Sequence, residues 1–380
     1  MADSNHHAFV VPVVLEPHPD ADRLSVVSVN AYTCVVATQD WQGVEKAVYI
    51  APDTVVPDTE EFAFLKRNNS ARVALDKEMQ EGKLTDEDVK IRLRHIEDGE
   101  VANTKNLRIT ARRLRGVQSF GMLWPTTECP LCNREQLHES ANCLKMMEVG
   151  DDAWDLMGLT RYEPPLPAEA GGETDTAPLL PWLHEYDVEN YYNWPNVLQE
   201  GEEVVATEKL DGANSRYTYA PDRQTGEYRM FVGGRTEWKR DSPNNLWWRA
   251  FRAHPWLEVF CKAHPDWTVY GETFGNVQEL KYGVKPNQPN KIRIFDVLAV
   301  NAFLDYAEFE TLFPPEQRVP VIYRGPWEVE KFKALSLGNS TFADHLREGI
   351  VVCPIKERYD RALGRVKLKL VSFDLLSKGK

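Results

Sequence analysis

A chain of 380 residues with 42% hydrophobic and 27% charged residues can form two domains with well-buried cores, and this composition is typical of soluble globular proteins. The net charge of −13 by itself argues against a nucleic-acid partner. No apolar run approaches the ~18 residues of a membrane span, and residues 1–7 lack the layout of a signal peptide, so we expect a cytoplasmic or otherwise intracellular protein with no membrane partner.

The charge is unevenly distributed along the chain. Residues 201–380 hold 27 basic and 24 acidic residues, whereas the first 200 residues hold 18 and 34. The C-terminal half is therefore mildly basic, which is compatible with phosphate contacts.

The N-terminal part is rich in short strand-like runs. Residues 9–15, 24–29, 33–37 and 46–50 carry β-branched and aromatic residues between turn signals, and residues 107–124 fit one or two further strands. Five or six short strands predict a small β-barrel within residues 1–160. The turn at residues 18–24 and the run at residues 114–122 resemble the OB-fold module of tRNA-binding domains.

OB barrels commonly bind nucleic acid through a basic face that carries aromatic residues. Arg108, Arg112, Arg113 and Arg115 could supply phosphate contacts on such a face. They could equally lie on a solvated strand face, and the sequence leaves both interpretations open.

Residues 66–103 have helical composition and predict a two-helix insertion in the barrel. Thr85 and Asp88 have the spacing of a capping box, with Asp in place of the usual Glu. Nothing in this insertion indicates catalysis.

A cysteine-rich segment follows at residues 126–147. Its candidate ligands have the spacing Cys-x2-Cys-x5-His-x4-Cys and are Cys129, Cys132, His138 and Cys143. Thiolates and imidazole are the ligands that tetrahedral zinc prefers, so we favour one structural zinc ion over three unrelated thiols.

Residues 161–178 are rich in Pro, Gly and acidic residues and form the best candidate linker. The second domain is expected to cover residues 179–380. It contains mostly strands, with helices predicted at residues 186–193, 245–253 and 341–347.

The second domain contains a charged turn, Glu208-Lys209-Leu210-Asp211-Gly212. Strand-like runs flank it at residues 204–206 and 216–219, so Lys209 should lie near a strand end. A lysine amine is nucleophilic only when deprotonated, and we expect burial and neighbouring cations to lower its pKa. The simpler alternative is a hairpin with a surface lysine.

The order of the later motifs favours a catalytic lysine. The turn is followed by Gly233-Gly234-Arg235, Tyr270-Gly271-Glu272, Phe295-Asp296, Glu348-Gly349 and Lys367-Leu368-Lys369. Together these six elements resemble the motif set of the covalent nucleotidyltransferases, which include ATP-dependent DNA and RNA ligases and mRNA-capping enzymes. The resemblance covers roughly residues 180–370. It implies an α+β protein with an OB-like barrel followed by a nucleotidyltransferase (ligase adenylation) domain of antiparallel sheets with flanking helices.

The resemblance also implies roles for individual residues. Lys209 would attack the α-phosphorus of ATP and form a lysyl–AMP intermediate; Lys367 and Lys369 would clamp the α-phosphate, and Glu348 and Asp211 would bind Mg²⁺ or Mn²⁺. Glu272 would contact the ribose or lie near the metal, and Arg235 would contact the ribose or the acceptor phosphate. Phe295 and Val351 would sandwich the adenine, with Glu208 and Asn214 as further nucleotide contacts.

The domain order narrows the resemblance further. Capping enzymes and most DNA ligases place their OB domain after the nucleotidyltransferase domain, whereas here the candidate OB domain comes first. That order is similar to RNA ligases that seal 3′-OH/5′-phosphate nicks in duplexes and act in RNA repair, so the expected partner is RNA with such ends, bound by a monomer. A minimal DNA ligase and a non-catalytic nucleic-acid-binding relative are the alternatives.

Overall fold

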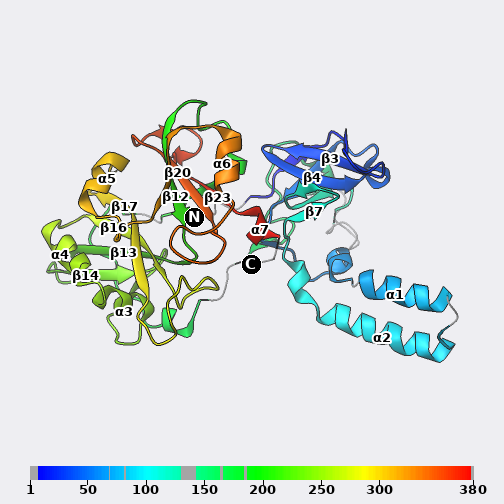
Figure 1. Ribbon diagram of the computed structural model, residues 1–380, viewed down its shortest axis with the longest axis horizontal. Helices are drawn as coiled ribbons and strands as arrows, with labels where there is room; N and C mark the ends of the chain where they lie inside the picture. The colour runs from blue at the N-terminus through cyan, green and yellow to red at the C-terminus, as the bar shows by residue number, and fades with distance from the viewer. Residues whose placement is uncertain are drawn as a thin grey trace. The chain divides into compact units, whose positions relative to one another are not determined.

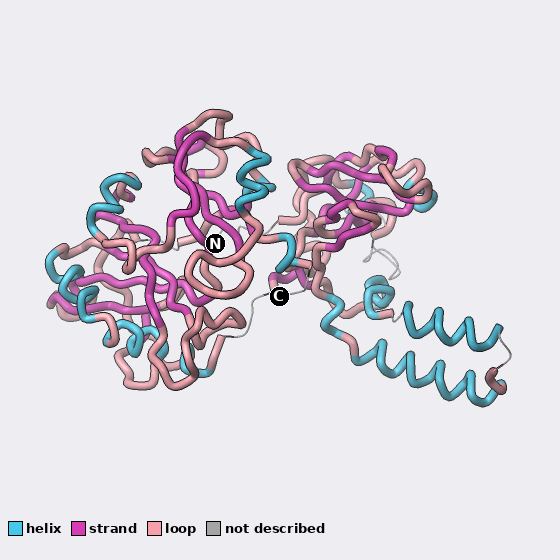
Figure 2. The backbone as a smooth tube through the Cα atoms, viewed as in Figure 1, coloured by secondary structure: helices cyan, strands magenta, loops and turns pink. Residues whose placement is uncertain are grey.

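The computed structural model describes residues 7–67, 69–80, 83–129, 143–162, 166–183 and 186–377. Two compact units form: residues 1–163 with 376–380, and residues 164–375 (Figure 1). Both contain strands and helices, so the α+β prediction is confirmed (Figure 2). Within the described residues, no helix combines the length and apolar character needed to cross a membrane.

The first unit is built from short antiparallel strands. In the residues that the structure describes, its strands are β1 (Val10–Pro12), β2 (Glu16–Pro17), β3 (Leu24–Val29), β4 (Tyr32–Ala37), β5 (Lys46–Ile50), β6 (Thr54–Val55), β7 (Arg112–Leu114), β8 (Val117–Ser119), β9 (Met122–Pro125) and β10 (Thr160–Arg161). The orders β1-β5-β9 and β2-β3-β4 form its two largest sheets. Alternate residues of β3 are buried, as expected when one face of a strand packs on a core.

The predicted two-helix insertion is present as α1 (Asn69–Gln80) and α2 (Asp86–Ala102). Both hydrogen bonds of the expected capping box form, because Thr85 accepts from the Asp88 N–H and the Asp88 carboxylate accepts from the Thr85 N–H. The Asp88 side chain, although shorter than Glu, therefore completes the capping box. Separately, Arg72 joins the two helices through a two-point ion pair with Glu100.

Two sheets dominate the second unit. One has the order β11-β23-β20-β12-β19, and its strands are β11 (Glu189–Asn190), β12 (Glu203–Lys209), β19 (Val321–Pro326), β20 (Gly349–Pro354) and β23 (Leu368–Val371). The other has the order β15-β14-β13-β16-β17-β18, and its strands are β13 (Gly212–Pro221), β14 (Tyr228–Gly233), β15 (Trp238–Lys239), β16 (Thr268–Phe274), β17 (Lys291–Ala299) and β18 (Ala302–Phe303). A small hairpin joins β21 (Tyr359–Asp360) to β22 (Gly364–Arg365).

Among the described residues, the α-helices of the second unit and its C-terminal end are α3 (Leu246–Arg252), α4 (Pro255–Ala263), α5 (Tyr306–Leu312), α6 (Val329–Leu335) and α7 (Phe373–Leu376). The Asn245 side chain caps α3 by accepting from the N–H groups of Trp247 and Trp248, in agreement with the helix predicted at residues 245–253. Helices α3 and α4 pack on β14 and β13, and their apolar faces form the main core with these strands.

Two predicted helices are wrong. Residues 189–190 form β11, which pairs in parallel with β23, and residues 191–193 form one 3-10 turn because Tyr191 and Tyr192 are both buried. Residues 341–347 form a turn closed by the Asn339–Leu346 bridge, in which Thr341 binds the Glu208 carboxylate. In both places side-chain burial or bonding outweighs helical composition.

Part of the expected linker packs on the second unit. Ala170 is buried against the main core, and Thr174 and Pro178 form isolated bridges with Lys239 and Asp222. These contacts order residues 170–178 along the edge of the six-stranded sheet.

Candidate active site

Lys209 lies where the chain passes from one large sheet to the other. Strand β12 ends at Lys209 in the five-stranded sheet, and β13 begins at Gly212 in the six-stranded sheet. A Cβ atom on Gly212 would lie 3.1 Å from the Glu272 side chain, so glycine permits this close approach to β16. The crossing brings groups from both sheets around one lysine.

The register of β12 and β20 explains the first contact of the lysine. Lys209 pairs with Gly349, so Glu348 lies at the end of β20 beside it. The Lys209 Nζ donates to Glu348 Oε1 at 2.5 Å, and the two side chains are 26% and 22% exposed. Gly349 has φ +155° and its Cα faces the Leu370 carbonyl, which leaves no space for a side chain.

The free protein keeps this lysine protonated. Burial lowers the pKa of Lys209, but the charges of Glu348 and Glu272 outweigh burial and raise the pKa above its ordinary value. Our expectation that burial and neighbouring cations lower this pKa is therefore wrong for the free protein, because the nearest charges are carboxylates. Neutralising those carboxylate charges would lower the pKa of Lys209.

Three carboxylates surround the lysine. Burial raises the pKa of Glu272 to about 8, with help from Glu348 and Asp211 and against the opposing charge of Lys209. Burial also raises the pKa values of Glu348 and Asp211. The Leu280 N–H donates to Asp211 Oδ2 at 2.9 Å and fixes this carboxylate in the turn.

These carboxylates suit a divalent cation. Glu348 Oε2 is buried and makes no hydrogen bond in the structure, so one carboxylate oxygen is available as a ligand. Where the chain is described, however, no three His, Cys, Asp or Glu side chains are grouped closely enough to form a complete metal site. Mg²⁺ and Mn²⁺ would then need further ligands from water and phosphate, as Mg²⁺ usually does.

Glu208 is almost fully buried next to Lys209, at 1% exposure. The Thr341 N–H and hydroxyl donate to Glu208 Oε2 at 2.9 and 2.7 Å, whereas Oε1 is buried without a hydrogen bond. A fixed carboxylate with one open oxygen can accept from a ligand N–H group.

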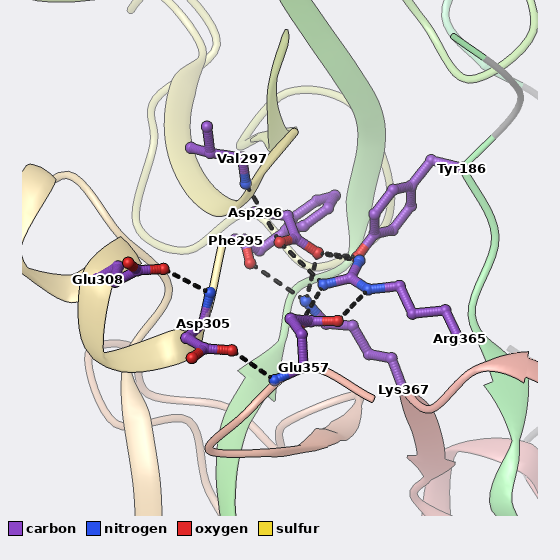
Figure 3. Close-up of polar contacts among 9 residues, drawn as sticks. All are labelled: Tyr186, Phe295, Asp296, Val297, Asp305, Glu308, Glu357, Arg365 and Lys367. Atoms are coloured by element: carbon purple, nitrogen blue, oxygen red, sulfur yellow. Dashed lines mark hydrogen bonds and ion pairs between the residues drawn. The ribbon is translucent and has the colours of Figure 1, made fainter. Parts of the chain in front are cut away.

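The two C-terminal lysines have different surroundings. Lys369 pairs with Val351 across β20 and β23, and its charge lowers the pKa of Glu348, which places it near Lys209. The Lys367 Nζ instead donates to Asp296 Oδ2 at 2.7 Å and to the Phe295 carbonyl at 3.3 Å (Figure 3). Sequence reasoning did not assign a role to Asp296, although an Asp within an apolar strand was a visible signal.

The remaining candidates lie on the same two sheets. Asn214 pairs with Glu272 across β13 and β16, and its Oδ1 is buried without a hydrogen bond. Arg235 follows β14, at the sheet end at which Asn214 lies. Phe295 packs against the cluster that contains Leu210, the residue after Lys209. Val351 is partly exposed on β20, and its carbonyl accepts from the Thr207 hydroxyl at 3.3 Å.

Two of the four candidate zinc ligands, Cys132 and His138, lie outside the described residues. The other two, Cys129 and Cys143, are 5% and 2% exposed and belong to one core cluster of the first unit. The zinc site stays a prediction.

The arginines of the first unit are not equivalent. Two nitrogens of Arg108 donate to Asp53 Oδ1 at 3.0 and 2.6 Å, and the guanidinium lies 3.6 Å from the Tyr162 ring centroid. The Arg108 guanidinium is thus bonded to residues of its own domain, which argues against its proposed phosphate contact. Arg112 is exposed, and it lines a cavity of about 460 Å³ with the aromatic residues Trp41, Phe64 and Trp124. Arg108 lines the same cavity, so the two arginines differ in their partners and not in their location.

Comparisons with known proteins agree with this geometry. Residues 202–371 match the RNA ligase family model, and residues 11–94 match an OB-fold domain model. No curated protein sequence matches the chain. The OB-like barrel and the sheet-rich nucleotidyltransferase domain predicted from sequence are both confirmed.

Solved structures of Naegleria gruberi RNA ligase have a similar fold. A mutant with ATP and Mn is 20% identical and covers 98% of this chain and 99% of its own, with a TM-score of 0.69. Another mutant with AMP and Mn, and the ligase with PPi, are each 21% identical, cover 98% of both chains and have TM-scores of 0.68.

Proposed function

Because residues 202–371 match the RNA ligase family model, we propose that this protein is an ATP-dependent RNA ligase that joins 3′-OH and 5′-phosphate ends. Lys209 carries the AMP in a lysyl–AMP intermediate. The observation that supports this most directly is the position of Lys209, which lies between two sheets, 2.5 Å from Glu348 and near Glu272 and Asp211. A surface lysine in a hairpin would not be surrounded by three carboxylates.

The first step is displacement at phosphorus. The Lys209 amine attacks the α-phosphorus of ATP, a P–N bond forms, and the bond to pyrophosphate breaks. The lysine must first lose the proton that its carboxylate neighbours hold on it. Glu348 and Asp211 would hold a divalent cation, whose positive charge would favour the neutral amine and offset phosphate charge.

The nucleotide contacts follow from the positions of the side chains. Glu208 Oε1 would accept from the adenine amino group, which a guanine carbonyl cannot replace. Phe295 and Val351 would contact the two faces of the base, and Glu272 and Asn214 would contact the ribose. Lys369, Lys367 and Arg235 would bind phosphate, because reactions at phosphorus depend mainly on positioning and charge neutralisation.

Two further steps complete the reaction. AMP moves from Lys209 to the 5′-phosphate end, and the 3′-OH then attacks that adenylated end, releases AMP and joins the strands. Aligning the two ends is an entropic problem that a template strand partly solves, so we propose nicked RNA duplexes as substrates and RNA repair as the role. The protein acts as a monomer.

The OB unit would hold the polynucleotide. Its cavity combines the exposed Arg112 with three aromatic side chains, a composition suited to a phosphate and an unstacked base. Arg113 and Arg115 are also exposed on the β7–β8 hairpin. Arg108 lines the same cavity, but Asp53 and Tyr162 hold its guanidinium, so RNA binding should depend mainly on the exposed arginines.

The test combines labelling and sealing. Incubation with α-labelled ATP and Mn²⁺ should attach AMP to the wild-type protein and to Lys262→Ala, an exposed lysine on α4, but not to Lys209→Ala. Label that persists in Lys209→Ala would refute the assignment of the nucleophile. Absence of label in the wild type would favour a non-catalytic nucleic-acid-binding relative.

The substrate is tested with nicked duplexes that differ only in the sugars on the 3′-OH side, at one salt concentration. We expect ribose at the terminal one or two positions to be required and the 5′-phosphate strand to tolerate DNA. Equal sealing of an all-DNA nick would favour a minimal DNA ligase.

A further inference from the structure

The Asp296 carboxylate is the meeting point of several side chains. Its Oδ2 accepts from the Tyr186 hydroxyl at 2.7 Å, from Arg365 at 2.6 Å and from the Lys367 Nζ at 2.7 Å (Figure 3). Its Oδ1 accepts from Arg365 at 3.1 Å and from the Val297 N–H at 3.1 Å. Asp296 is 3% exposed, so its charge depends on these partners.

The two cations on this carboxylate are held differently. Arg365 makes two hydrogen bonds to Asp296 and two to Glu357, at 2.8 and 2.5 Å, and its guanidinium lies 3.6 Å from the Phe303 ring centroid. Lys367 makes one bond to Asp296 and a longer bond to a carbonyl. A planar guanidinium fixed between two carboxylates cannot move without breaking four bonds, whereas a lysine ammonium can turn on its flexible stem.

This difference decides which cation can leave. If Lys367 turned away, Asp296 would keep Arg365, the Tyr186 hydroxyl and the Val297 N–H as partners. If Arg365 turned away, Glu357 would lose its cation as well. Lys367 is therefore the exchangeable partner, and Arg365 is the permanent counterion.

We propose that Asp296 is a positioning residue, which holds the Lys367 ammonium beside Phe295 in the free protein and releases it to the nucleotide phosphate when ATP binds. The inference rests on the proposed function, because it takes the reaction of ATP with Lys209 as given. It adds a role for a residue that touches neither the nucleotide nor Lys209: Asp296 acts through Lys367.

A purely structural role for this buried network is the alternative. Loss of Asp296 would then lower stability and activity whether or not Lys367 is present. A positioning role predicts that Asp296 matters for the reaction only through Lys367. A double-mutant cycle separates these two cases, because coupled residues show non-additive effects.

The experiment measures single-turnover formation of lysyl–AMP and the Tm for wild type, Asp296→Asn, Lys367→Ala and the double variant. We expect Asp296→Asn to slow the step at saturating ATP by about 10–100-fold, as loss of an oriented charged contact does. In the Lys367→Ala background, the same change should cost less than about threefold. Equal fold losses in both backgrounds would overturn the proposal.

A matched control and a second variant keep the test decisive. Glu357→Gln removes the other partner of Arg365 without touching Lys367, so it should lower the Tm but change the rate by less than about threefold. If Asp296→Asn does not fold, Asp296→Glu keeps the charge but displaces the carboxylate, and the same cycle applies. If Lys367→Ala forms no measurable adduct, calorimetric ATP affinity supplies the cycle.

The controls also separate the two proposals. A wild-type protein that forms no lysyl–AMP would refute the proposed function. A wild-type protein that forms it, with additive losses in the cycle, would refute only the role of Asp296.

Discussion

Glu272 provides a direct test of the charge balance around Lys209. The change Glu272→Gln keeps the shape of the side chain and an oxygen that can accept from the Gly212 N–H, but removes the charge. Burial raises the pKa of Glu272 from an ordinary 4.5 to about 8. A carboxyl with a raised pKa binds more protons in the folded state, so its contribution to stability is full below pH 4.5 and is lost as the pH rises through 8.

The size of the effect follows from the same values. The difference between 4.5 and about 8 corresponds to at most about 5 kcal/mol, at ~1.36 kcal/mol per pH unit. Glu272 is only partly buried, and water relaxes around it, so we expect about 1–3 kcal/mol. At about 2–4 °C per kcal/mol, the Tm difference between variant and wild type should change by several degrees.

Thermal unfolding between pH 5 and pH 8.5, without divalent cations, measures this difference. Glu272→Gln should gain stability relative to the wild type as the pH rises, because it has no charge to bury. Glu227→Gln, in the exposed β13–β14 turn, is the matched control and should follow the wild type. Parallel Tm curves for Glu272→Gln and the wild type would refute the raised pKa and the reasoning built on it.

Three further predictions concern other parts of the protein. Arg108→Ala should lower the Tm of the first unit by several degrees with little change in RNA affinity. Arg112→Ala should leave the Tm unchanged, weaken RNA binding and reduce the slope of log affinity against log salt concentration by about 1. The reverse pattern would contradict the assignment of RNA binding to Arg112. Glu208→Gln should narrow the preference for ATP over GTP by about tenfold in labelling rates, because an amide can also donate to a guanine carbonyl. Metal analysis should find close to one zinc per chain, held in part by Cys129 and Cys143; less than about 0.2 zinc with intact thiols would count against the site.

The catalytic candidates were named from sequence because their motifs follow one another in the order of the covalent nucleotidyltransferases. The contact between Lys209 and Glu348 itself depends on the register of β12 and β20, which joins residues far apart in the chain. The capping box at Thr85 was predictable from sequence alone, because it depends only on the local spacing of Thr85 and Asp88.

The charge environment was not predictable in this way. The pKa of Lys209 depends on Glu272 and Glu348, which come from different sheets, and one sequence does not state which side chains end up close in space. Arg108 is a second example. Its basic neighbours along the chain suggested a phosphate contact, whereas in the structure its guanidinium contacts Asp53 and Tyr162. In both cases the outcome depended on which side chains lie close together in the folded protein.

The two proposed phosphate-binding regions have a common feature in the free protein. Lys209 donates to Glu348, and Lys367 donates to Asp296, so each lysine is already paired with a carboxylate. Under the proposed function, binding of a nucleotide with a divalent cation would exchange these partners: the cation would neutralise Glu348, Arg365 would stay bonded to Asp296 and Glu357, and both lysines could face phosphate. Each carboxylate would then keep a bonded cation, which limits the cost of an unpaired buried charge. On this proposal, Lys209 stays protonated and unreactive until the nucleotide binds.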